Sequence, residues 1–128
     1  MTTELNMLVW SVVLGLLQIA IAASCSMGQR GLAWTLGPRD AIPSLTGIAA
    51  RLDRASTNFL VTFPFFVAVV FAAHLLQRHD AMTVLGAQLY FWARLAYVPV
   101  YAAGIPYLRT LIWAVSIAGI VLLLGALF

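Results

Sequence analysis

The stretch Tyr90–Arg109, YFWARLAYVPVYAAGIPYLR, combines an apolar run long enough to lie in a membrane with an arginine near the middle of that run. An arginine at such a depth costs about 2.5–3.5 kcal/mol on insertion scales, unless its side chain reaches the interface or finds a polar partner. Arg94 is therefore expected to face the interior of a helix bundle or a water-filled cleft. The side chains on the same helix face then indicate the role of Arg94.

The whole chain has the composition of a membrane protein. Of its 128 residues, 63% are hydrophobic and 9% are charged, against about 25% charged residues in an ordinary soluble domain. Four segments contain the roughly 20 apolar residues that cross a bilayer, or nearly so. They lie at about 5–25, 55–76, 82–103 and 108–128. We predict a single all-α domain over residues 1–128, an integral membrane protein folded as a left-handed four-helix bundle.

The first apolar segment has an alternative interpretation as a signal peptide, because the small residues Ala22, Ala23 and Ser24 faintly resemble a processing site. A signal peptide needs positive charge before its apolar region, and the only charged residue there is Glu4. We therefore expect the segment to be retained as the first helix.

The connections between the segments differ in length and polarity. The first, SMGQRGLAWTLGPRDAIP at 26–43, is punctuated by glycine and proline and is expected to be a loop. Ser44 is a plausible N-cap for a second helix that reaches Leu76, a length of about 50 Å, so its first turns should project from the bilayer. The connections QRHDA and AGIPY are short, which favours antiparallel neighbours in one bundle.

Arginine is distributed unevenly between the two ends of the predicted bundle. One end has only Arg78, whereas the end with the first and third loops has five arginines. These are Arg30, Arg39, Arg51, Arg54 and Arg109. Because basic residues accumulate in cytoplasmic loops, we predict that the first and third loops are cytoplasmic and that both termini lie on the opposite side.

Several classes of function are disfavoured by what the chain lacks. Its seven basic residues are all arginine and are scattered, with a net charge of +3, so no nucleic-acid-binding surface is expected. The sequence has no phosphate-binding loop, dinucleotide fingerprint, metal-ligand spacing or nucleophile elbow. Because Cys25 is the single cysteine, no internal disulfide can form. Neither a metal site nor catalysis by a dedicated protein nucleophile is predicted.

Two lines of side chains recur at spacings of three and four residues, which places each line on one helix face. On the second helix the line comprises Arg51, Arg54, Asn58, Thr62 and Phe65. On the third helix it comprises Tyr90, Arg94, Tyr97 and Tyr101. The membrane-depth arginine thus shares its face with three tyrosines.

No acid lies within a spanning segment to pair with Arg94. A buried cation without an acid can accept an anion from outside the protein, and a guanidinium binds a carboxylate through two parallel hydrogen bonds. The alternative is that Arg94 snorkels to the interface and that its tyrosines belong to an aromatic belt. The residues alone leave both interpretations open.

Two segments resemble the MAPEG family, the membrane-associated proteins in eicosanoid and glutathione metabolism. RLDRASTNFLVTFP, at 51–64, is similar to the family's second-helix pattern of two arginines, asparagine, glutamate and proline. Residues 90–109 are similar to its third-helix pattern of arginine and two tyrosines, followed by an arginine at the start of the fourth helix. The family's glutamate falls on Val61, and the tyrosine often next to it falls on Thr62.

The resemblance implies a homotrimer that binds glutathione between neighbouring subunits, near the cytoplasmic side of the membrane. The residues that would hold the carboxylates and backbone of glutathione are Arg51, Arg54, Asn58, Arg94, Tyr97 and Tyr101. Arg109 would correspond to the catalytic arginine, which stabilises the thiolate and so lowers the pKa of the thiol. Arg30 is matched to a further glutathione contact just after the first helix.

Three functions are compatible with these features. The first, implied by the resemblance, is a glutathione-dependent transferase or peroxidase acting on lipophilic electrophiles from the bilayer, with the glutathione thiolate as nucleophile. The second is a non-catalytic membrane protein of the same fold that binds a lipid, another anion or a partner protein. Val61 favours it, because valine cannot accept a hydrogen bond from the glutathione amine. The third is a small exporter, which is least favoured because His74 is the only titratable candidate within the membrane.

Overall fold

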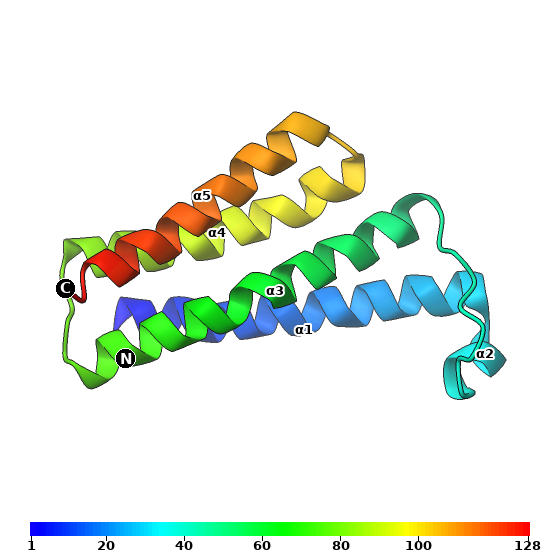
Figure 1. Ribbon diagram of the computed structural model, residues 1–128, viewed down its shortest axis with the longest axis horizontal. Coiled ribbons are helices and arrows are strands. Elements are labelled where there is room, and N and C mark those ends of the chain that lie inside the picture. The colour runs from blue at the N-terminus through cyan, green and yellow to red at the C-terminus, as the bar shows by residue number, and fades with distance from the viewer.

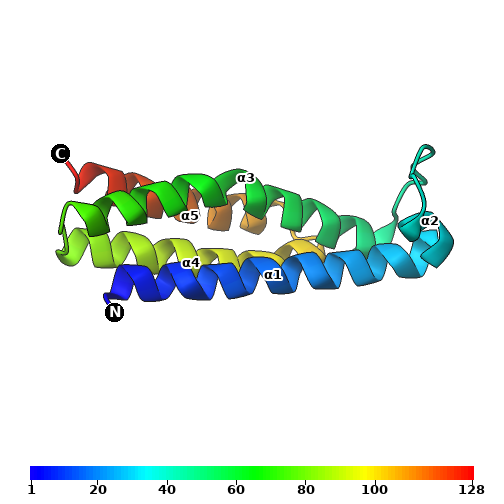
Figure 2. The same ribbon diagram turned by 90° about the horizontal axis from the view of Figure 1, so that it is seen from below.

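Four long helices lie side by side along the long axis of the protein, and a fifth, short helix lies at one end (Figure 1, Figure 2). The computed structural model describes residues 1–128 and contains no strand. Its helices are α1 (Thr3–Arg30), α2 (Leu32–Leu36), α3 (Gly47–Leu75), α4 (Ala81–Ala103) and α5 (Pro106–Gly125). The prediction of an all-α chain is confirmed.

The helix α4 contacts each of the other long helices, α1, α3 and α5. Both ends of the chain and the connection between α3 and α4 lie at one end of the protein, whereas α2 and the turn between α4 and α5 lie at the other (Figure 1). We call the latter the arginine end, because five of the seven arginines lie in its connections or in the helix turns next to them. They are Arg30, Arg39, Arg51, Arg54 and Arg109.

The start and end of α4 follow from local chemistry. Asp80 and Thr83 form a capping box that satisfies the first backbone N–H groups of the helix. The helix ends at Gly104, whose φ of 77° is a left-handed conformation that glycine adopts without strain. Pro106 is the first residue of α5. A backbone N–H at this position would have no partner within the helix, so the lack of an N–H in proline removes no hydrogen bond. The turn between α4 and α5 is therefore very short.

The connection between α1 and α3 contains more helix than expected. α1 continues to Arg30, beyond residue 25, and the expected loop includes α2. α3 begins at Gly47 rather than at about residue 44, after Thr46 in an extended conformation. The Gln29 side chain explains this start, because its amide pairs with the backbone N–H and carbonyl of Thr46, each at 3.0 Å. Ser44 therefore lies outside the helix, and its prediction as the N-cap is wrong.

Three helices, α1, α3 and α5, are long and apolar enough to cross a membrane. This is typical of an integral membrane protein. α4 has 23 residues, about 35 Å at the α-helical rise and thus long enough to span. Gln88, Arg94 and three tyrosines interrupt the apolar side chains of its central stretch, so a fourth span at 82–103 stays a prediction.

Apolar side chains from all four long helices meet in one buried cluster. Its members are Leu14, Phe59, Phe66, Val70, Ala87, Tyr90, Phe91, Ile120 and Leu123. The rings of Phe66 and Tyr90 stack with their centroids 4.0 Å apart, and the Tyr90 hydroxyl lies 3.1 Å from the Thr62 hydroxyl. Tyr90 and Thr62, one from each polar line, therefore join α3 to α4 inside the core.

The backbones of α4 and α5 meet at Gly86 and Gly119. A Cβ added to either glycine would lie 2.6 Å from the carbonyl oxygen of the other. Non-bonded carbon and oxygen atoms do not approach so closely, so any larger residue would separate the helices. Small residues allow such close contact between helices in membranes, where packing rather than water exclusion holds them together.

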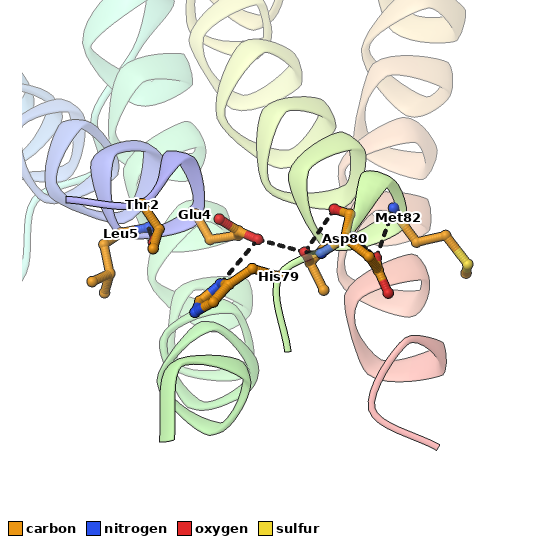
Figure 3. Close-up of polar contacts among 7 residues, drawn as sticks. Thr2, Glu4, Leu5, His79, Asp80 and Met82 are labelled. Atoms are coloured by element: carbon orange, nitrogen blue, oxygen red, sulfur yellow. Dashed lines mark hydrogen bonds and ion pairs between the residues drawn. The ribbon is translucent and has the colours of Figure 1, made fainter. Parts of the chain in front are cut away.

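A polar cluster joins the first turn of α1 to the start of α4 (Figure 3). This is the end of the protein opposite the arginine end (Figure 1). The Glu4 side chain is 2% exposed. Its carboxylate accepts a hydrogen bond from the Thr83 hydroxyl and lies 3.4 Å from Nδ1 of His79. Because burial of a carboxylate is costly unless it is hydrogen-bonded, these contacts hold α1 against the connection between α3 and α4.

Candidate functional site

Arg94 is fully buried between α3 and α4. Its exposed fraction is 0%, so the side chain does not snorkel to the interface. Nη1 donates to Oδ1 of Asn58 at 2.9 Å, and the guanidinium carbon lies 4.3 Å from the centroid of the Tyr97 ring. Nε and Nη2 have no hydrogen-bond partner. A buried cation thus retains two nitrogens that can donate to a further acceptor.

Nearer the arginine end, residues from α3, from the end of α4 and from the start of α5 line a pocket of about 120 Å³. They are Arg51, Arg54, Tyr101, Gly104, Pro106 and Arg109. We call this the arginine pocket. Three of its six lining residues carry a positive charge and none carries a negative charge.

Tyr101 contacts two of the three arginines in the pocket. Nε of Arg54 donates to the Tyr101 hydroxyl at 3.0 Å, and the guanidinium carbon of Arg109 lies 4.9 Å from the centroid of the ring. Arg51 instead donates from Nη1 to the Ala102 carbonyl at 3.2 Å. This carbonyl lies at the C-terminal end of α4, where the helix dipole favours a cation.

Gly104 is what allows Arg51 to reach the end of α4. A Cβ at this position would lie 3.1 Å from the guanidinium carbon of Arg51. The positive φ of the residue also disfavours any other amino acid there. The same glycine therefore makes the turn and shapes the pocket.

Two tyrosines join Arg94 to the arginine pocket along one face of α4. The rings of Tyr97 and Tyr101 have centroids 5.5 Å apart, and they lie between Arg94 on one side and Arg54 and Arg109 on the other. The structure thus brings together, in one continuous line, seven of the eight residues that the resemblance implied. They are Arg51, Arg54, Asn58, Arg94, Tyr97, Tyr101 and Arg109.

No carboxylate neutralises these arginines. The single ion pair of the structure, between Glu4 and His79, lies at the opposite end of the protein, and Asp80 caps α4 at that same end. Asp53 lines a different pocket. An uncompensated set of guanidinium groups attracts and binds anions, carboxylates and phosphates above all.

The polar line of α3 ends at Asn58. Val61, about one helix turn further from the arginine end, is 63% exposed. Thr62 does not belong to the site, because its hydroxyl pairs with Tyr90 in the core. Val61 itself therefore presents an apolar surface and offers no hydrogen-bond acceptor to a ligand.

A second pair of arginines lies where α2 meets α1. The guanidinium carbons of Arg30 and Arg39 lie 4.7 Å and 5.2 Å from the centroid of the Trp34 ring. With Asp53 and Ser56 they help to line a separate pocket of about 330 Å³. Arg30 is therefore not part of the arginine pocket of its own chain. Trp34 was not identified from the sequence, because Arg30 and Arg39 lie on either side of it in different segments and follow no single helical spacing with it.

The sequence itself was compared with known proteins. The model of the MAPEG family matches residues 7–128, a stretch that includes every residue of the arginine pocket and the Arg94 cluster. No curated protein matches the chain.

Proposed function

The chain belongs to the MAPEG family, and from that premise we propose that it binds glutathione at the arginine pocket and acts as a transferase or peroxidase on lipophilic electrophiles. The observation that carries this proposal is the line of four arginines, Arg51, Arg54, Arg94 and Arg109, without a carboxylate partner. Glutathione has two carboxylates, and guanidinium groups are suited to hold them through paired hydrogen bonds.

The side chains present fit such an anion. Arg94 has two buried nitrogens without a partner, and a buried charge is costly until its hydrogen bonds are satisfied. Arg51 and Arg54 are held in place by the end of α4 and by Tyr101, so they would bind a carboxylate with little loss of side-chain freedom. Asn58, Tyr97 and Tyr101 would position the rest of the molecule.

In the reaction, bound glutathione would supply the thiolate that attacks the electrophile. Arg109 is the residue proposed to favour this ionised form, because a nearby cation lowers the pKa of a thiol. Its guanidinium packs on the Tyr101 ring, which limits its freedom and keeps its charge in the pocket. Tyr101 is oriented in turn by Arg54. The chain therefore needs no nucleophile of its own.

We further propose that the site is completed by a second copy of the chain, as a homotrimer of left-handed four-helix bundles. The arginine pocket of one chain is about 120 Å³, below the range of about 300–1,000 Å³ typical of small-molecule sites. A neighbouring subunit would supply the missing wall. Arg30, which lies in a separate pocket of its own chain, would reach the ligand only from such a neighbour.

The proposed orientation of the protein in the membrane follows from the positive charge of the arginine end. Five arginines lie there and only Arg78 lies at the other loop end, and basic residues accumulate on the cytoplasmic side. The first and third loops would be cytoplasmic, and both termini would lie on the opposite side. Glutathione would then enter from the cytoplasm, while lipophilic substrates would enter from the bilayer.

The role of Arg109 is tested by the ultraviolet absorbance of the bound thiolate. In Arg109→Ala we expect this absorbance to fall roughly tenfold or more at neutral pH, because loss of the cation returns the thiol towards its ordinary pKa. Arg39→Ala is the matched control, since Arg39 lies at the same end but lines the other pocket. An undiminished signal in Arg109→Ala would show that this arginine does not stabilise the thiolate.

Val61 supports a second candidate function, a non-catalytic protein of the same fold that binds another anion, a lipid or a partner protein. The glutathione amine would find no acceptor at this exposed valine. We expect Val61→Glu to tighten glutathione binding about tenfold in calorimetry, as a charge-assisted hydrogen bond does.

Val61→Gln is the control for charge in that experiment, because it adds a polar group of similar size without the negative charge. Binding by the unmodified protein would support the enzyme. Binding that appears only in Val61→Glu would favour the second function, and the search for a ligand would turn to other anions.

A further inference from the structure

A groove of about 470 Å³ runs between α1 and α4 on the outside of the bundle, within the volume range of small-molecule sites. Its walls include Leu17 and Ile21 from α1 and Trp92, Leu95 and Pro99 from α4. These side chains are apolar and partly exposed, as expected for a surface that faces lipid. The exception among the lining residues is Gln18.

Gln18 is buried without hydrogen bonds. It is 6% exposed, yet neither Oε1 nor Nε2 has a partner. An amide that is removed from water without hydrogen bonds destabilises the fold. Pro99, in the same groove, has no N–H to donate to the Leu95 carbonyl one turn earlier. The Gln18 amide is therefore an unpaired polar group in an otherwise apolar wall.

The depth of Gln18 limits what can satisfy it. Fifteen residues of α1 precede Gln18 and twelve follow it, so the residue lies about 20 Å from either end of the helix. A hydrocarbon core is roughly 30 Å thick, so lipid head groups do not reach this level. A partner for the amide must carry its polar group within an apolar body.

We propose that the groove binds a single-chain lipid that carries a hydroxyl group in the middle of its hydrocarbon chain, and that the Gln18 amide hydrogen-bonds this hydroxyl. A hydroxyl both donates and accepts, which matches the carbonyl and NH₂ groups of the amide. The chain on either side of it would pack along the apolar walls. An unsubstituted acyl chain would fill the same space but leave the amide without a partner.

The groove is separate from the arginine pocket. Trp92, Leu95 and Pro99 lie on the face of α4 opposite to Arg94 and Tyr101, as their helical spacing requires. Binding in the groove therefore does not depend on glutathione, and its test does not depend on the proposed enzyme activity.

The test compares two esters that differ by one hydroxyl, methyl ricinoleate and methyl oleate, on the delipidated full-length protein in detergent. Methyl esters have no carboxylate, so the arginines do not contribute to their binding. Affinity is measured by titration in native mass spectrometry. We expect methyl ricinoleate to bind about fivefold more tightly, as one additional buried hydrogen bond predicts.

Gln18→Leu should remove this preference, whereas Gln88→Leu should leave it intact, because Gln88 is exposed and lines a different groove between α4 and α5. Without ligand, Gln18→Leu should unfold at the same or a higher temperature, since it replaces an unpaired amide by an apolar side chain. Equal affinities for the two esters in the unmodified protein would overturn the proposal. So would a preference that persists in Gln18→Leu, or a lower unfolding temperature in that variant, which would show that the amide has a structural partner.

Discussion

Replacement of Arg94 by methionine is expected to raise the stability of the protein and at the same time to remove its affinity for glutathione. The side chain is 0% exposed and only one of its three nitrogens has a partner. Replacement of buried ion pairs by apolar side chains of similar volume is often stabilising by about 1–4 kcal/mol, and Arg94 has no counter-ion that would be left unpaired. Asn58, which would lose its donor, is partly exposed and can be hydrated.

Loss of ligand binding in Arg94→Met should be large. Removal of one partner of a buried, hydrogen-bonded charge pair typically costs about 2–5 kcal/mol, which corresponds to roughly a 30-fold or greater loss of affinity. Calorimetry with glutathione measures the affinity, and thermal unfolding in detergent measures the stability. The loss of affinity and the gain of stability should appear together, because a residue that is retained for ligand binding often destabilises the fold without ligand.

Arg78→Met provides the control for Arg94→Met, since Arg78 is exposed in the connection between α3 and α4. It should change neither affinity nor unfolding temperature appreciably. An Arg94→Met protein that unfolds earlier but binds normally would mean that Arg94 serves the packing of α3 against α4. The proposed function would then lose its deepest contact.

The largest loss of stability is expected for Gly119→Ala. The added methyl carbon would lie 2.6 Å from the Gly86 carbonyl oxygen and 2.8 Å from the backbone nitrogen of Tyr90. Both contacts are to backbone atoms, which cannot turn aside as a flexible side chain can. Relief requires α4 and α5 to separate, and overpacking of this kind costs about 1–3 kcal/mol or more. Thermal unfolding should begin at a clearly lower temperature.

Gly125→Ala is the matched control for Gly119→Ala. It lies in the same helix, and a Cβ there would meet nothing within 4 Å. Because alanine is the better helix former, this variant should be neutral or stabilised by up to about 1 kcal/mol. If the two variants unfolded at the same temperature, the close contact between α4 and α5 would not exist in the folded protein.

The face that carries Arg94, Tyr97 and Tyr101 was predictable from the sequence, because the helical period is a local property of the backbone. The periodicity alone did not show that Thr62 faces the core. Its spacing put it on the polar line, but its hydroxyl is used by Tyr90 in the core. The rotation of each helix about its axis decides whether a residue of the line faces a ligand or a neighbouring helix. The spacing of residues within one helix gives no information about that rotation.

The start of α3 shows the same limit at shorter range. Ser44 has a side chain suited to an N-cap. However, the Gln29 amide hydrogen-bonds the backbone N–H and carbonyl of Thr46, and the helix begins at Gly47. A cap is chosen by competition among all hydrogen-bonding groups that reach the chain. Gln29 is distant in sequence, so local reasoning could not include it.

By itself, the sequence determined an all-helical chain, the apolar lengths suited to a membrane, and a face on which an uncompensated arginine accompanies tyrosines. These depend on composition and on one-helix geometry. Only the tertiary structure decided that Arg94 is buried rather than snorkelling, that α4 and α5 meet at Gly86 and Gly119, and that Gln18 lies unpaired in a groove. The physical reason is that helix rotation and register are set jointly by side chains from several helices, whose contacts form only when the chain packs.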